Sequence, residues 1–202
     1  MAECPVLRIE LLGGFRVTLG THAVPDTAWR RSKAAGLVKL LALAPAHRLH
    51  REQVMEILWP ELAPAVAAAN LRKAVYYARH AADADLAVDF ITATGDVLSL
   101  PSEHVRTDVS AWRTSAAQAR RAGDPAVYAA AIELYGDGLL PEDRYEEWTI
   151  PHRDELQTEF VALLEELAVL LEARGEIEEV IRAADRLVTI DPLREGGHVL
   201  LI

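Results

Sequence analysis

Cysteine and lysine are scarce in this chain of 202 residues. Cys4 is the single cysteine, so the chain cannot form an internal disulfide or a cysteine-rich metal site. No stretch approaches the roughly 18 apolar residues that a membrane-spanning helix requires. The N-terminus also lacks the basic start and the apolar run of a secretion signal. We therefore expect a cytoplasmic protein with no membrane partner.

Patterns that carry enzymatic chemistry are also missing. The sequence contains no glycine-rich phosphate loop, no nucleophile elbow and no paired metal ligands. His47 and His50 lack the spacing and the companion ligands of a zinc helix, and their position favours capping of the following helix. We therefore expect no catalytic residue, no cofactor and no metal, and we do not expect an enzyme.

The charge is distributed unevenly along the chain, whose formal net charge is −10. Residues 1–100 hold 11 Lys and Arg against 10 Asp and Glu, a net charge of +1. Residues 101–202 hold 10 against 21, a net charge of −11, and the three lysines all lie in the first half. This asymmetry indicates two domains with different partners, although any single glutamate also fits a solvated helix surface.

Residues 1–100 carry strand patterns, then helix patterns, then strand patterns again. Alternating apolar and polar residues around Gly13–Gly14 predict a small antiparallel meander, and alternation around Thr94–Asp96 predicts a hairpin. Helical spacing of apolar residues, interrupted by prolines, predicts three helices between them. The expected ranges are 7–11, 15–19 and 23–24 for the strands, about 32–44, 51–58 and 64–82 for the helices, and 88–92 with 97–100 for the hairpin. This order is typical of a winged helix-turn-helix domain with an N-terminal sheet.

The remainder of the chain reads as helix. The expected helices are 109–121, 125–135, 145–173, 177–189 and 193–202, and residues 161–194 also fit one tetratricopeptide-like unit. The fold class is therefore an α+β winged helix followed by an all-α, tetratricopeptide-like domain. We place the boundary between residues 1–103 and 104–202. Because the chain stops inside a helical pattern, we expect the second domain to be truncated at its C-terminus.

Four large aromatic residues in the second half allow two interpretations: Trp112, Tyr135, Tyr145 and Trp148. They either lie on the side that faces the first domain or form internal core of the helical domain.

The third expected helix presents a mixed basic and aromatic face. On a helical wheel with about 100° per residue, Ala74, Val75 and Ala78 point the same way as Leu71 and pack inward. The outward side chains and a basic group at the first helix are the candidate DNA-binding residues: Ala69, Arg72, Lys73, Tyr76, Tyr77, Arg79 and His80, with Arg30, Arg31 and Lys33. An ordinary solvated helix face is the alternative, and the hairpin carries no Lys or Arg to insert into a minor groove.

Several motifs in order resemble the SARP-type (antibiotic regulatory) activators. In the first half they are Leu12–Phe15, Trp29–Ala34, His47–Glu52, Leu58–Glu61 and Asn70–Val75; in the second they are Leu134–Asp143, Tyr145–Trp148, Arg153 and Asp191–Glu195. The resemblance covers residues 7–202. It implies a response-regulator-type winged helix, without a phosphoacceptor domain, joined to a bacterial transcriptional activation domain.

The resemblance also implies partners. Members of the family bind direct repeats in promoter DNA side by side and help to recruit RNA polymerase, so we expect double-stranded DNA, RNA polymerase and another copy of the chain on DNA as partners. The family's usual basic positions correspond to Arg72, Lys73 and Arg79, while Ala78 and His80 stand where it often has a further basic residue. The alternative is a regulatory scaffold, or a fragment of a larger regulator, with weak DNA binding.

Overall fold

The computed structural model of the chain describes residues 5–29, 33–81 and 90–190. The chain divides into two compact units. The first consists of Met1–Leu11 and Phe15–Thr107, and the second of Leu12–Gly14 and Asp108–Ile202. The functional boundary predicted between residues 103 and 104 stays a prediction. In the described part of the chain, no helix is both long enough and apolar enough to cross a membrane.

A four-stranded sheet in the order β3-β2-β1-β7 opens the first unit. Its strands are β1 (Leu7–Glu10), β2 (Arg16–Leu19), β3 (His22–Ala23) and β7 (Val105–Thr107). The antiparallel pairing of β1, β2 and β3 confirms the predicted meander, and every second side chain of β1 and β2 is buried. The parallel strand β7 beside β1, with Leu7 opposite Val105, was not predicted.

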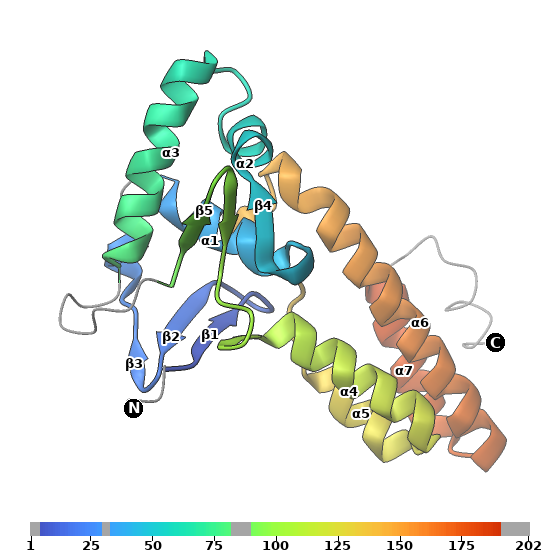
Figure 1. Cartoon of the computed structure of the whole chain (residues 1–202). Coiled ribbons are helices and arrows are strands. Elements are labelled where there is room, and N and C mark those ends of the chain that lie inside the picture. Colours follow the sequence, from blue (N-terminus) through green and yellow to red (C-terminus); the bar gives the residue numbers. More distant parts are fainter. Residues whose placement is uncertain (1–4, 30–32, 82–89, 191–202) are drawn as a thin grey trace. The chain divides into compact units, whose positions relative to one another are not determined.

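Three helices follow the meander (Figure 1): α1 (Ala34–Leu43), α2 (Arg51–Leu58) and α3 (Pro64–Arg79). The predicted bounds of α2 are confirmed, while α3 ends earlier than expected. Pro64 suits the first turn of α3 because backbone N–H groups in the first turn of a helix have no acceptor within the helix. Proline, which lacks this N–H, therefore costs no hydrogen bond there. The residues that α3 buries recur every three or four positions and pack on α1 and α2: Ala67, Leu71, Ala74 and Ala78.

A three-stranded sheet in the order β4-β6-β5 completes the first unit. Strands β5 (Thr92–Thr94) and β6 (Val97–Ser99) form the predicted hairpin, whose expected residues 88–89 lie outside the described residues. The sequence did not predict β4 (Arg48–His50), in which Arg48 lies opposite Ser99. The expected capping of the next helix is confirmed for His50, while His47 lies in the turn before β4. Helix α2 begins directly after β4, where the Gln53 side chain accepts a 2.9 Å hydrogen bond from the His50 amide.

The second unit is helical and contains α4 (Asp108–Ala122), α5 (Pro125–Glu133), α6 (Ile150–Arg174) and α7 (Ile177–Ile190). Helices α6 and α7 lie side by side, as Figure 1 shows. The sequence predicted that α6 begins at Tyr145, but the helix begins at Ile150. The preceding turn is fixed by the Thr149 hydroxyl, which donates to the carbonyl oxygens of Asp143 and Glu146 at 3.1 and 2.8 Å. The helix expected from residue 193 lies outside the described residues.

Aromatic packing forms the centre of the second unit. The Tyr135 and Phe160 rings stack at 3.9 Å, and the Trp112 ring lies 5.2 Å from that of Tyr135. The core interpretation therefore holds for Trp112 and Tyr135, whereas the Tyr145 side chain is 91% exposed. The segment Leu12–Gly14 also belongs to this unit, where Leu12 forms an antiparallel bridge with Leu139.

Candidate nucleic-acid interface

Helix α3 has an exposed side opposite its buried residues. Arg72, Lys73, Tyr76 and His80 are exposed, with 57% of Tyr76 accessible. Tyr77 and Ala69 are half-buried at the edges of this side. The helical wheel thus correctly predicted Leu71, Ala74 and Ala78 as buried. Val75, which it also placed inward, is half-buried and lines the groove described below.

The aromatic side chains on α3 are ordered by one another. The His80 ring stacks on that of Tyr76 at 4.2 Å, and the Tyr77 ring meets Tyr76 edge to face at 5.6 Å. The Nδ1 atom of His80 also lies 2.7 Å from the carbonyl oxygen of Tyr76, at the C-terminal end of the helix. These contacts restrain the aromatic ring of Tyr76, which lies beside the basic residues of α3.

Arg79 is directed away from the exposed side and toward the hairpin. Its Nε atom donates a hydrogen bond of 2.9 Å to the carbonyl oxygen of Ile91, the residue before β5. The contact is partly buried. Of the basic candidates on α3, Arg79 thus connects the helix to the hairpin, while Arg72 and Lys73 extend from the helix.

A groove of about 530 Å³ lies between α3 and the hairpin. Three arginines and one histidine line it, together with apolar and tyrosine side chains: Arg51, Leu71, Arg72, Val75, Tyr76, Arg79, His80, Ala93 and Leu98. No acidic side chain occurs among these lining residues. Arg51 stands in the motif His47–Glu52 but was not among the candidate DNA-binding residues. The groove therefore combines positive charge with apolar and aromatic surface. Such a surface can attract a negatively charged ligand and also contact its apolar groups.

The hairpin is fixed to the start of α2 but carries no positive charge. The Arg51 amide donates a 2.8 Å hydrogen bond to the carbonyl oxygen of Asp96 at the turn. The hydroxyls of Thr92 and Ser99 lie 2.8 Å apart across the strands. The exposed residues from Thr92 to Asp96 include one acid and no base, so the hairpin offers only hydroxyls and backbone amides as hydrogen-bond donors.

The remaining basic candidates differ in their surroundings. Lys33 is half-buried at the start of α1, where its carbonyl accepts from the Leu37 amide. Arg30 and Arg31 lie outside the described residues. Lys39 is buried, and its ammonium lies 4.8 Å from the centre of the Phe15 ring. Within the described ranges, no group of three or more His, Cys, Asp or Glu side chains could hold a metal ion.

Comparison with known proteins identifies the family. Residues 102–202, half of the chain, match the family model of the bacterial transcriptional activator domain. The chain belongs to the SARP-type transcription activators. These activators are transcription regulators, not enzymes, and the match lies on the acidic half of the chain.

A solved structure shares the fold of this SARP-type chain. It is Mycobacterium tuberculosis EmbR in complex with a low affinity phosphopeptide, with a TM-score of 0.77 and 21% sequence identity. The similarity covers 98% of this chain and 54% of EmbR, so the chain spans about half the length of that relative. At this identity the likeness shows the fold alone, which is small sheets with helices followed by a helical domain. Comparison with curated proteins gives no match.

Proposed function

We propose that this SARP-type regulator binds specific duplex DNA through α3, with residues 1–103 as the DNA-binding domain. The observation that carries the proposal is the groove between α3 and the hairpin, which has three arginines and no acid among its lining residues. A helix of this type enters the major groove and meets the base edges with its outward side chains. The net charge of the whole chain does not oppose this function, because the excess of acid lies in residues 101–202.

The exposed residues of α3 differ in the contacts they would make. Arg72 and Lys73 extend far enough to meet guanine or phosphate, and Ala69 is small enough to contact a thymine methyl. Tyr76, Tyr77 and His80 form the stacked surface nearer the end of the helix and suit the sugar-phosphate backbone. Arg79 positions the hairpin, and Arg30, Arg31 and Lys33 would meet phosphate near the first helix.

The second domain, residues 104–202, would serve protein contacts. Helices α6 and α7 pack on each other, and we propose that they form a tetratricopeptide-like unit. The family resemblance implies RNA polymerase as the partner of these acidic helices. The same resemblance supports binding of two copies side by side on direct repeats in a promoter.

Selection of bound sites from a random duplex library tests DNA binding directly. We expect enrichment of a tandem repeat, with log affinity falling with log salt at a slope of about −0.9 per neutralised phosphate. Arg72→Ala weakens binding, whereas Arg121→Ala is the matched control, since Arg121 is an exposed arginine of the second unit. Failure to enrich any sequence at low salt would reject the proposal.

A regulatory scaffold is the competing function, and one observation favours it. The hairpin offers no Lys or Arg to DNA from Thr92 to Asp96. A scaffold with residual DNA affinity would show a shallow salt slope and equal affinity for all sequences. The same titration therefore separates the two functions.

A further inference from the structure

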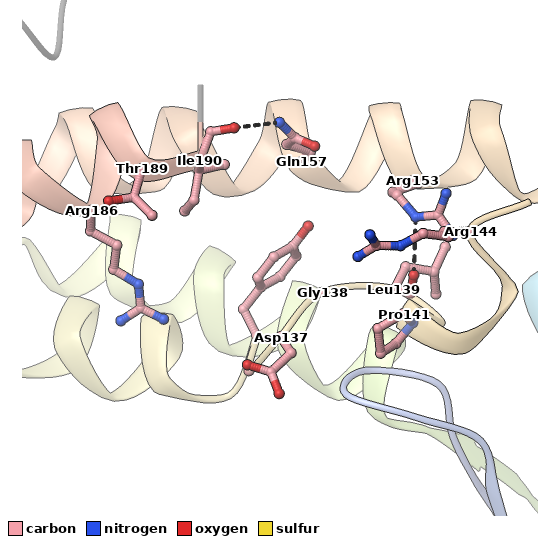
Figure 2. A pocket seen from close by; sticks show the side chains of 12 residues that line it. Asp137, Gly138, Leu139, Pro141, Arg144, Arg153, Gln157, Arg186, Thr189 and Ile190 are labelled. Carbon is pink, nitrogen blue, oxygen red and sulfur yellow. Dashed lines mark hydrogen bonds between the residues drawn. The ribbon is translucent and has the colours of Figure 1, made fainter. Parts of the chain in front are cut away.

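The second unit contains a hollow of about 610 Å³ between the loop after α5 and helices α6 and α7 (Figure 2). Its lining residues come from three places: Tyr135 to Leu139, Pro141 and Arg144 from the loop, Arg153 and Gln157 from α6, and Arg186, Thr189 and Ile190 from α7. A volume of this size lies within the range of about 300–1,000 Å³ that small-molecule sites occupy.

The hollow is positively charged although its domain is strongly acidic. Three arginines line it against one acidic residue, Asp137, whereas residues 101–202 carry a net charge of −11. Elsewhere in the unit, Arg113 and Arg120 form ion pairs with glutamates of α6. The lining residues of the hollow therefore carry more positive than negative charge, which favours a bound anion.

Arg153 and Arg144 form the core of this positive charge. Arg153 donates from Nε and Nη2 to the carbonyl oxygens of Leu139 and Leu140, at 3.3 and 3.2 Å, so its guanidinium is held in place. Arg144 is exposed and lines the same hollow as Arg153 (Figure 2). Guanidinium groups that line one hollow repel each other, and an anion bound between them removes that repulsion.

Arg186 contributes from the opposite wall. Its Nη1 atom lies 3.1 Å from a carboxylate oxygen of Glu133, and its guanidinium lies 5.3 Å from the centre of the Phe160 ring. The carboxylate partner balances part of this charge, so Arg186 adds less to the anion site than Arg144 and Arg153.

Tyr135 supplies a neutral hydrogen-bond donor to the same hollow. Its ring is buried and stacked on Phe160, and burial raises the pKa of the phenol to about 12. The hydroxyl is therefore protonated at neutral pH. The Tyr135 side chain lines the hollow, and its hydroxyl makes no hydrogen bond to any residue that the structure describes.

We propose that this hollow binds a small molecule that carries a phosphate group. Two guanidinium groups and a phenol supply more donors than one carboxylate can accept from, and a phosphate offers three oxygens and a charge of about −2. Leu139, Pro141 and Ile190 provide apolar wall for the organic part of the ligand. The site lies wholly in the second unit and does not depend on DNA binding.

Titration of the full chain with phenyl phosphate, followed by NMR of backbone amides and arginine Nε groups, tests the site. We expect shifts at Gly136, Gly138 and the Nε of Arg153, and tighter binding of phenyl phosphate than of benzoate. Arg144→Ala should weaken binding about tenfold, since it removes one charged donor and no hydrogen bond to any residue that the structure describes. Arg121→Ala, which removes an exposed arginine elsewhere in the unit, should leave binding unchanged.

Three outcomes would overturn the proposal. Absence of these shifts at millimolar phenyl phosphate rejects the site. Binding of benzoate as tight as that of phenyl phosphate rejects the phosphate assignment. Binding of a polyglutamate peptide, without binding of either small molecule, assigns the hollow to an acidic protein partner instead. Arg153→Lys gives a second variant, expected to weaken binding while it keeps a cation near the loop carbonyls.

Discussion

The guanidinium of Arg79 and the backbone carbonyl of Ile91 are joined by a 2.9 Å hydrogen bond from Nε. This bond attaches the last turn of α3 to the residue that precedes the first strand of the hairpin. The helix and the hairpin together form the walls of the arginine-lined groove. The width of that groove therefore depends on a side chain that the sequence had suggested as a direct DNA contact.

Replacement of Arg79 by alanine should loosen the hairpin. A partly buried carbonyl that loses a charged donor costs about 1–3 kcal/mol, so the free energy of unfolding of the first unit should fall by about that amount. Hydrogen exchange at the amides of β5 and β6 measures the loosening. Arg72→Ala is the matched control because Arg72 is exposed on the same helix, and its effect on stability should stay within about 0.5 kcal/mol. Equal exchange rates in the two variants would contradict the role of Arg79.

The buried aromatic cluster of the second unit predicts a strong contrast between two aromatic residues. Phe160 is completely buried and stacked on Tyr135, so Phe160→Ala should destabilise that unit by about 3–5 kcal/mol. Tyr145 is 91% exposed, and Tyr145→Ala should change stability by less than about 0.5 kcal/mol. Guanidinium titration followed by helical circular dichroism measures both. A large loss from Tyr145→Ala would show that its ring is covered in solution.

His152 predicts a pH dependence of stability. Burial lowers the pKa of its imidazole from 6.5, and Glu155, which raises it, and Arg113, which lowers it, have smaller effects. The unfolded chain therefore binds a proton more readily than the folded chain, and stability is lost as the pH falls below 6.5. The His152→Asn variant should lose less stability over this interval than the unaltered chain. Urea titrations at several pH values measure the difference, and parallel curves for the two proteins would contradict the prediction.

Substitutions of Lys73 and Lys39 should differ in their effect on the salt dependence of DNA binding. Lys73 is exposed on α3, so Lys73→Gln should reduce the slope of log affinity against log salt by about one. Lys39 is buried against Phe15, so Lys39→Gln should leave this slope unchanged. Titrations at several salt concentrations measure both slopes. A reduced slope for Lys39→Gln would place its ammonium near phosphate.

Periodic segments of the sequence predicted the fold well. The inward side of α3 and the bounds of α2 followed from the spacing of apolar residues and from the flanking prolines. Strands β4 and β7 were missed because each pairs with a strand far away in the sequence, so no hairpin turn next to it marks the pairing. The start of α6 was misplaced because Tyr145 to Trp148 contain good helix formers, while the Thr149 hydroxyl bonds fix a turn there instead.

The candidate site was predictable in its residues and not in its geometry. A helical wheel identifies Arg72 and Lys73 as outward, but it cannot show that the Arg79 side chain ends on a carbonyl twelve positions away. Arg51 was not selected because its place in the groove depends on β4, which was not predicted. The hollow between α6 and α7 depends on contacts between distant segments, such as Arg153 with Leu139, which no local pattern indicates.

The pairing of β1 with β7 has a consequence for synthesis on the ribosome. Leu7 lies opposite Val105, so β1 is synthesised nearly a hundred residues before its parallel neighbour β7. The interval between synthesis of Leu12 and of its bridge partner Leu139 is longer still. Translation is slow compared with the formation of a hairpin, which takes about 1–10 μs. The edge of β1 that later pairs with β7 is therefore unpaired for seconds on the nascent chain. We expect a chaperone to bind this edge during that interval.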